Sequence, residues 1–156
     1  MTSPEIVQPL TTALQIALAN TLSSTFNVRP DFLVGHSIGE IAAAYVAESM
    51  TMKEAIICSY FRGKITGQLS TAGSMATVGL SPSQVIPLLE TGAEIGCVNS
   101  PLNVTVSGDV DAVHATLGSL GSHYQGAFVR QLPVTKAYHS GRPMALFIRV
   151  HRQHFR

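Results

Sequence analysis

A serine flanked by glycines is the strongest chemical signal in the sequence. Gly35, Ser37 and Gly39 follow a short apolar run, 32–34, and precede an alanine-rich stretch. The pattern is typical of a nucleophile elbow, a strand-to-helix turn so tight that a β-carbon at either glycine would clash. Such a turn lifts the serine hydroxyl clear, and the N–H of Ile38 at the helix N-terminus can donate to a developing oxyanion. The alternative interpretation is a structural glycine turn.

A serine nucleophile needs a base to take its proton. His139 follows the last predicted strand, where the chain leaves a smaller subunit, and we predict it as the base, with a structural loop histidine as the alternative. His36 is adjacent to the serine, but neighbouring side chains diverge on a sharp turn, so we expect it to be packed and hydrogen-bonded. His114 and His123 are interpreted as surface or structural residues.

One arginine after the elbow is a candidate for a binding role. Arg62 lies near the end of the helix predicted after the elbow, just before Gly63. An arginine in a pocket can hold a carboxylate with two parallel hydrogen bonds, which lysine cannot match. The alternative is a solvated helix arginine.

Apolar spacing and capping signals predict the elements of the first half. The recurrence of leucine every four residues from Leu10 to Leu22 predicts a long first helix. The run 32–34 is predicted to be a buried strand. Helices over 38–48 and 51–69 follow it, the second opened by a capping box from Thr51. The order helix, strand, turn, helix, helix suits an α/β sheet.

The second half of the sequence has a different pattern of predicted elements, with more strands. Four strands and two helices are predicted, in the order strand 75–80, helix 81–90, strand 94–99, strand 103–107, a helix capped by Asp109, and strand 126–132. A second capping box opens the helix at Ser81. The order β-α-β-β-α-β is the split βαβ pattern of a ferredoxin-like unit.

Composition excludes several classes of protein. The chain has 156 residues, a net charge of +1, 46% hydrophobic and 12% charged residues, which excludes a disordered segment and disfavours a nucleic-acid binder. The apolar run 41–47 is far shorter than the roughly 20 residues that span a bilayer, and no cationic signal start precedes Arg29. Cys58 and Cys97 make neither a disulfide framework nor a metal site. We expect a cytoplasmic globular chain with no metal, no nucleic-acid partner and no membrane contact.

Further short motifs accompany these residues in order along the chain. They are Gly35-His36-Ser37-Ile38-Gly39-Glu40, Arg62-Gly63, Gly73-Ser74-Met75, Asn99-Ser100-Pro101, Val106-Ser107-Gly108 and Ala137-Tyr138-His139-Ser140. Over residues 8–140 the sequence resembles malonyl-CoA:acyl carrier protein transacylases, and most of all the acyltransferase domains of iterative, fungal-type polyketide synthases.

The resemblance implies a fold. It predicts an α/β architecture with a partial α/β-hydrolase-like large subdomain and an inserted ferredoxin-like (βαββαβ) small subdomain, with the active site between them. The expected division is residues 1–72 for the large subdomain, 73–134 for the small one, and 135–156 for a return segment that carries the histidine.

The resemblance also implies roles. Ser37 would be the acylated nucleophile, His139 its base and acid, and Arg62 the clamp for the free carboxylate of a malonyl group. The Ile38 N–H would be one of two oxyanion donors. No bound cofactor is expected: a coenzyme A thioester such as malonyl-CoA is the substrate, and the phosphopantetheine arm of an acyl carrier protein receives the acyl group.

Substrate choice is expected to depend on a few neighbouring side chains. His36, Asn99 and Tyr138 are predicted to line the substrate pocket. Ile38 and Tyr138 match malonyl-selective rather than methylmalonyl-selective members, although a steric preference of this kind is worth only about 1–3 kcal/mol.

Two other readings stay open at the level of sequence. A serine esterase or thioesterase of the α/β-hydrolase class would need an acid between serine and histidine, and Asp109 and Asp111 are the only aspartates in that interval. A truncated, non-catalytic fragment is the other reading. The family's N-terminal strand and glycine-glutamine loop have no counterpart here, and residues 142–156 hold four arginines and two histidines without an acid. We interpret this divergent basic tail as a foreign end, with a phosphate- or membrane-seeking tail as the alternative, and expect the isolated chain to be poorly active and marginally stable.

Overall fold

The chain divides into two compact units, Met1–Gln68 and Leu69–Arg156. A computed structural model describes residues 3–68 and 72–141 of them. The basic tail predicted at 142–156 and the predicted end of a helix at Leu69 lie outside the described residues.

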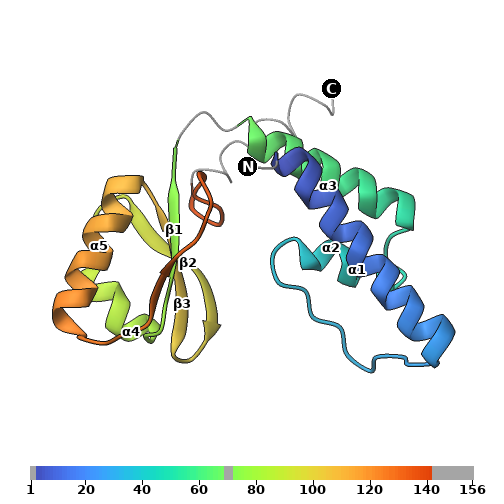
Figure 1. Cartoon of the computed structure of the whole chain (residues 1–156), viewed down its shortest axis with the longest axis horizontal. Coiled ribbons are helices and arrows are strands. Elements are labelled where there is room, and N and C mark those ends of the chain that lie inside the picture. The colour runs from blue at the N-terminus through green and yellow to red at the C-terminus, as the bar shows by residue number, and fades with distance from the viewer. Residues whose placement is uncertain (1–2, 69–71, 142–156) are drawn as a thin grey trace. The chain divides into compact units, whose positions relative to one another are not determined.

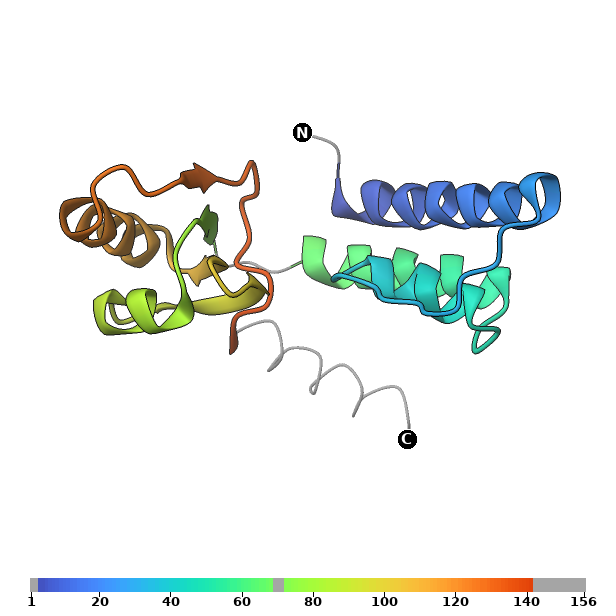
Figure 2. The same ribbon diagram turned by 90° about the horizontal axis from the view of Figure 1, so that it is seen from below.

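The described part of the first unit is helical. It contains α1 (Pro4–Phe26), α2 (Gly39–Val46) and α3 (Met52–Gly67). Figures 1 and 2 both show α1 and α3 side by side along most of their length. Ile16, Ala42 and Ala55 form the centre of a small core, one from each helix. Among the described residues, no helix combines the length and the hydropathy needed to cross a membrane.

The predicted capping box at the start of α3 is confirmed. The Thr51 N–H donates to Glu54 Oε2 over 2.8 Å, and the Glu54 N–H donates to Thr51 Oγ1 over 3.2 Å. These reciprocal bonds satisfy N–H groups that a helix start leaves without partners. Thr51 donates to Glu54 from its backbone N–H, which has the larger effect, and also from its hydroxyl. Both hydrogen bonds hold the pKa of Glu54 below its ordinary value. The start of α3 is therefore determined locally.

The predicted first helix is confirmed, but its leucines do not form the contact with α3. The buried residues of α1 are two polar ones, Gln8 and Thr12, and one apolar one, Ile16. The leucines of the four-residue repeat remain 49–62% exposed. The two backbones approach closely at the start of α1: a β-carbon placed on Gly63 of α3 would lie 2.3 Å from the carbonyl oxygen of Pro4. Tyr60 donates to Glu5 over 2.9 Å in the same contact, and this hydrogen bond and the charge of Glu5 raise the pKa of Tyr60.

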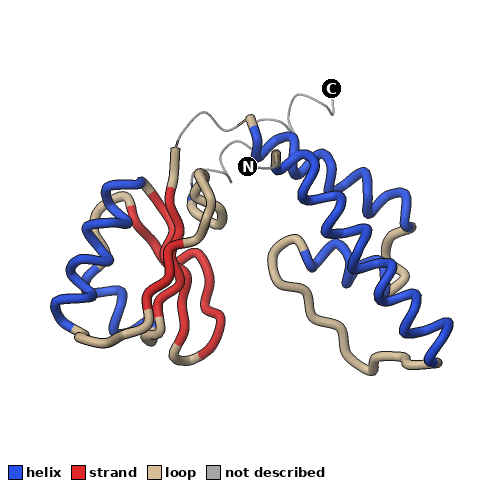
Figure 3. The backbone as a smooth tube through the Cα atoms, viewed as in Figure 1, coloured by secondary structure: helices blue, strands red, loops and turns tan. Residues whose placement is uncertain are grey.

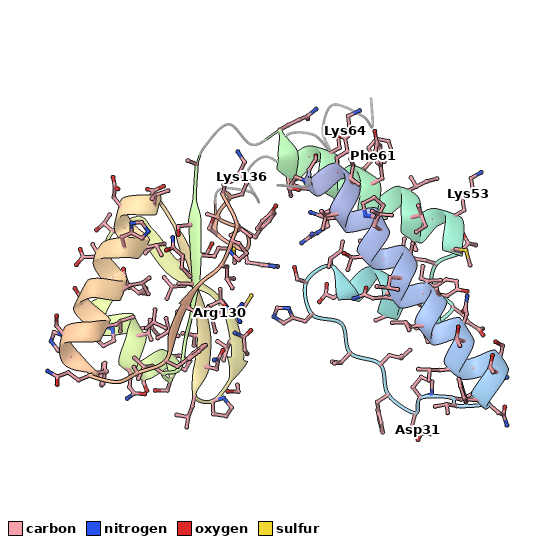
Figure 4. The ribbon with its side chains drawn as sticks, viewed as in Figure 1. Asp31, Lys53, Phe61, Lys64, Arg130 and Lys136 are labelled. Carbon is pink, nitrogen blue, oxygen red and sulfur yellow. The ribbon has the colours of Figure 1, made fainter. Side chains whose placement is uncertain are left out.

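The predicted strand at 32–34 is wrong. The chain between α1 and α2 is irregular (Figure 3), with Phe32 and Val34 exposed to 93% and 98%. Figure 4 places Asp31 on this connection, away from the three helices. A strand requires a neighbour to accept and donate its backbone hydrogen bonds, and no described residue of this unit pairs with 32–34. Apolar composition alone could not reveal that.

The second unit is built on one antiparallel sheet. Its strands are β1 (Ser74–Val78), β2 (Ala93–Ser100), β3 (Asn103–Gly108) and β4 (Val129–Gln131), in the spatial order β2-β3-β1-β4. Helices α4 (Pro82–Val85) and α5 (Val110–His123) lie on the same face of the sheet (Figure 1). Their contact with the sheet forms the larger core, whose fully buried members include Val78, Val85, Val104, Val106, Val113 and Leu120. The order of strands and helices matches the order predicted from the sequence.

The helix predicted over 81–90 is shorter than expected. Ser81 does open α4 with a capping box, in which the Ser81 N–H donates to Gln84 Oε1 over 3.0 Å. However, α4 ends at Val85 and a 3₁₀ turn, η1 (Ile86–Leu88), continues the chain. Pro87 explains the change, because it has no N–H to donate to the carbonyl four residues earlier and its ring collides with that turn.

The close approach of α1 and α3 generates a stability prediction. Gly63→Ala would place a methyl group against the Pro4 carbonyl, so we expect a loss of about 1–3 kcal/mol in the free energy of unfolding. Gly67→Ala, in the same helix, meets nothing within 4 Å and should gain up to about 1 kcal/mol from helix propensity. Thermal unfolding followed by circular dichroism measures both; equal melting temperatures for the two variants would contradict this packing.

Candidate active site

Ser37 lies at a strained turn immediately before α2. Its φ is +56°, in the left-handed region that side chains other than glycine rarely adopt. The carbonyl of His36 accepts from the Gly39 N–H over 3.0 Å, and the carbonyl of Ser37 accepts from the Glu40 N–H over 3.2 Å. A residue in this region costs on the order of 1–3 kcal/mol and persists only where its surroundings determine it. Ser37 is therefore held in an unusual conformation by the start of α2.

Within this unit, only one of the two flanking glycines occupies a position where a β-carbon would clash. A β-carbon on Gly35 would lie 2.4 Å from the backbone of Glu40, whereas one on Gly39 would have Gln15 Nε2 as its nearest neighbour, at 3.7 Å. The prediction that both glycines prevent a clash is thus correct for Gly35 and wrong for Gly39. The turn folds back on the first residues of α2, so it crowds Gly35 and leaves Gly39 facing a side chain at ordinary contact distance.

Arg62 of α3 reaches the serine. Its Nη2 donates to Ser37 Oγ over 3.3 Å, and its Nη1 donates to Gln8 Oε1 over 2.8 Å. Arg62 and Ser37 are both half-buried, so water screens the positive charge only in part. The fold thus brings together two residues that the sequence predicted separately, a hydroxyl and a cation able to bind a carboxylate.

Gln8 is a residue of this site that sequence reasoning missed. Its side chain is only 8% exposed, and its Nε2 donates to Thr66 Oγ1 over 3.2 Å while its Oε1 accepts from Arg62. Thr66 in turn donates to the carbonyls of Arg62 and Gly63. The Gln8 amide therefore fixes one end of the guanidinium. A polar residue within the apolar repeat of α1 was the available signal.

Ile38 and His36 flank the serine and differ in environment. Ile38 is the N-cap of α2, so its N–H lies at the positive end of the helix dipole. The side chain of His36 is exposed. The expectation that His36 is packed is therefore wrong within this unit.

His139 belongs to the second unit, on the segment that follows β4. Its φ is +60°, so it shares the left-handed conformation of Ser37. The segment lies close to the sheet: the Gly73 N–H donates to the Thr135 carbonyl over 3.0 Å, and a β-carbon on Gly73 would lie 2.3 Å from the Ala137 N. Ser140 Oγ donates to the Ala137 carbonyl over 2.9 Å. His139 itself is exposed.

Asn99 and Tyr138 also belong to the second unit. Asn99, on β2, donates from Nδ2 to Asn103 Oδ1 over 2.8 Å and to Thr105 Oγ1 over 3.0 Å. The backbone carbonyl of Tyr138 accepts from Ser107 Oγ over 2.6 Å, and its side chain is half-buried. Among residues 3–68 and 72–141, no group of three or more His, Cys, Asp or Glu is arranged to hold a metal ion.

The two aspartates that a hydrolase triad would require occupy the start of α5. Asp109 is the N-cap and Asp111 lies in the first turn. Acidic residues are stabilising at this end of a helix because they interact favourably with its dipole. The helix dipole therefore favours an acidic residue at both positions.

Comparison with known proteins gives one consistent result. The family model described as acyl transferase domain matches residues 1–146. The chain is 47% identical over 140 residues to the highly reducing polyketide synthase gloL of Glarea lozoyensis, covering 90% of this chain and 6% of that protein. It is 47% identical over 133 residues to the squalestatin hexaketide synthase clz14 of Cochliobolus lunatus, covering 85% of this chain and 5% of that one.

A solved structure agrees with these relatives. The crystal structure of the acyltransferase domain from the second module of the salinomycin polyketide synthase superposes with a TM-score of 0.86 at 33% identity, over 96% of this chain and 35% of that chain. The chain thus spans a small part of the curated relatives and about a third of the chain in this solved structure.

The asymmetry of the two glycines predicts different tolerance to substitution. Gly35→Ala must displace backbone atoms of Glu40, so we expect a loss of about 1–3 kcal/mol in the free energy of unfolding. Gly39→Ala should be neutral or slightly stabilising, because alanine is favoured within α2. Chemical denaturation of both variants measures this; a larger loss for Gly39→Ala would contradict the geometry of the turn.

Proposed function

Because the chain belongs to the acyl transferase domain family, we propose that it moves a malonyl group from coenzyme A to an acyl carrier protein in polyketide biosynthesis. The acyl group would be carried as an ester on Ser37. The names of its relatives, which are polyketide synthases, support a role in polyketide biosynthesis. Within this proposal the first unit is part of an α/β-hydrolase-like subdomain, residues 1–72, and residues 73–134 form the ferredoxin-like one, followed by the return segment 135–156.

One observation carries the proposal: a guanidinium donates to the hydroxyl that would be acylated. Arg62 Nη2 lies 3.3 Å from Ser37 Oγ. In a malonyl thioester one methylene separates the reacting carbonyl from the free carboxylate, so both ends must lie close together at the site. A carboxylate accepts stronger, charge-assisted hydrogen bonds than a neutral hydroxyl. An arriving malonyl group can therefore replace Ser37 as the acceptor of this bond and place its thioester next to the serine.

The first half-reaction acylates the serine. His139 takes the proton of Ser37, and the oxygen attacks the thioester carbonyl of malonyl-CoA. The Ile38 N–H, at the N-terminus of α2, donates to the oxyanion of the tetrahedral intermediate. As the carbon–sulfur bond breaks, His139 returns the proton to the leaving coenzyme A thiolate, and the malonyl ester on Ser37 remains.

The second half-reaction reverses these roles. The thiol of the carrier protein's phosphopantetheine arm gives its proton to His139 and attacks the ester, and Ser37 leaves with the proton that His139 returns. Arg62 holds the malonyl carboxylate through both steps, which orients the acyl chain. Asn99, His36 and Tyr138 are proposed to line the path of the substrate.

Trapping the acyl ester tests this function. We expect the chain, incubated with malonyl-CoA, to gain one malonyl group that peptide mass spectrometry locates on Ser37. Single acylation does not require rapid turnover. Ser37→Ala should abolish the adduct, and His139→Ala should slow its formation by about 10²–10⁴-fold, the usual contribution of a general base. Acetyl-CoA, whose acyl group lacks the free carboxylate, serves as the comparison substrate.

Two controls make the result decisive. Cys58 is an exposed free thiol that can accept an acyl group without catalysis, so the experiment is repeated with Cys58→Ser. Burial raises the pKa of the Cys97 thiol, which lowers its thiolate fraction and its background reactivity. Addition of a pantetheine thiol then separates the candidate activities: a transferase keeps the ester until the thiol arrives, whereas a thioesterase loses it to water. An adduct that survives Ser37→Ala contradicts the proposal.

The hydrogen bond from Arg62 to Gln8 predicts an effect on substrate choice. Gln8→Leu removes the acceptor and leaves the guanidinium without its fixed end. Because hydrogen bonds to charged groups contribute about 1.5–3 kcal/mol, we expect at least about a tenfold fall in the preference for malonyl-CoA over acetyl-CoA. Acylation of Ser37 by the two thioesters, in competition, measures this ratio.

Thr12→Val is the matched control for Gln8→Leu. Thr12 lies one turn further along the same face of α1 and is fully buried. Among the described residues its Oγ1 has no hydrogen-bond partner, so an isosteric apolar side chain should preserve or raise stability. An equal change in the malonyl preference of both variants would mean that Gln8 acts through general packing and not through Arg62.

A further inference from the structure

We propose that Ser107 is a positioning residue for His139, acting through the backbone between Tyr138 and His139. This inference rests on the proposed role of His139 as the base. Ser107 belongs to β3, more than thirty residues before the histidine in sequence. Its hydroxyl is fully buried within the unit and makes no part of the chemistry described above.

The contact is made with the peptide group that precedes the histidine. Ser107 Oγ donates to the carbonyl of Tyr138 over 2.6 Å, toward the short end of the ordinary range for an O–H···O hydrogen bond. This carbonyl and the His139 N–H belong to the same planar peptide group. Holding the carbonyl therefore holds the plane from which the φ rotation of His139 starts.

The φ torsion of His139 has an unusual value. His139 has a φ of +60°, which is unfavourable for a residue with a β-carbon. Without a restraint the backbone would return to negative φ, and the direction of the imidazole would change with it. The hydrogen bond from Ser107 is a restraint placed where it can oppose this return.

The neighbouring strand makes room for the arrangement. A β-carbon on Gly96 of β2 would lie 3.2 Å from Ser107 Cβ and 3.4 Å from His139 Cβ. Gly96 falls where the pairing of β2 with β3 shifts register, between Ile95 and Cys97. Such bulges are frequent where a strand supports a functional side chain. Glycine at this position lets the histidine segment lie directly on the sheet.

The backbone after His139 is also held by a hydrogen bond to the sheet. The Gly141 N–H donates to Glu94 Oε1 over 2.7 Å, so β2 holds the residues after the histidine while β3 holds the one before it. Two attachment points on adjacent strands leave the backbone of His139 little freedom. Ser107 is the one that acts on the strained torsion.

Two readouts test the inference, one independent of activity. At positive φ the amide and α protons of a residue are unusually close, so the native chain should give a strong intraresidue NMR cross-peak at His139. We expect Ser107→Ala to weaken it and to lower the rate of Ser37 acylation by roughly 10–100-fold, the effect of misplacing a catalytic group by about an ångström. In a His139→Ala background, Ser107→Ala should have no further effect on that rate, because the two residues act as one unit.

Thr116→Val is the matched control. Thr116 is fully buried on α5, and its Oγ1 accepts from the Glu90 N–H over 3.0 Å, so the variant also removes one buried hydroxyl from this unit. Thr116→Val should change the melting temperature. It should change neither the His139 cross-peak nor the extent to which His139→Ala slows Ser37 acylation. Should Ser107→Ala not fold, Ser107→Cys, which keeps the shape but donates weakly, is measured in its place.

The outcomes separate the two proposals. An unchanged cross-peak in the Ser107 variant overturns the inference, whatever the activity. A rate loss equal in the native and His139→Ala backgrounds also overturns it, since this indicates a general structural role. If instead His139→Ala acylates Ser37 at the native rate, the proposed function fails, and the cross-peak alone then decides whether Ser107 holds the torsion.

Discussion

The site in the first unit depends on the two hydrogen bonds that the Arg62 guanidinium donates. The guanidinium donates to Gln8 of α1 and to Ser37 at the start of α2, while its own residue belongs to α3. Three segments are thus joined at one cation. The bond requires α1 to approach α3 closely, and Gly63 permits this because any larger residue would collide with Pro4. A packing constraint between two helices therefore determines where a positive charge meets a hydroxyl.

Both residues proposed for proton transfer are held in left-handed backbone conformations, Ser37 at φ +56° and His139 at φ +60°. Each is an energetic cost that its unit offsets by local contacts. For Ser37 these are the turn and the start of α2. For His139 they are Ser107, Gly96 and the fastening of Gly141 to Glu94. In both cases the backbone directs the side chain, so these neighbours help to orient the two residues that the proposed reaction uses.

Much of the local structure could be predicted because short-range signals determine it. The capping boxes at Thr51 and Ser81 and the apolar face of α5 depend on residues three or four positions apart. The strand expected at 32–34 failed for the opposite reason, because a strand exists only with a partner and composition contains no information about one. The helix from Ser81 ends earlier than predicted because Pro87 cannot donate the hydrogen bond that would continue it.

The sequence alone supplied the candidate chemistry: a serine between glycines, a later histidine and an arginine, whose types and order are typical of acyl transfer or hydrolysis. Only the tertiary structure decided which groups support them. Gln8 could not be assigned to Arg62, nor Ser107 to the carbonyl before His139, since a hydrogen bond between distant residues depends on how helices and strands pack. Residue type specifies what a group can do, whereas packing specifies which group it acts on.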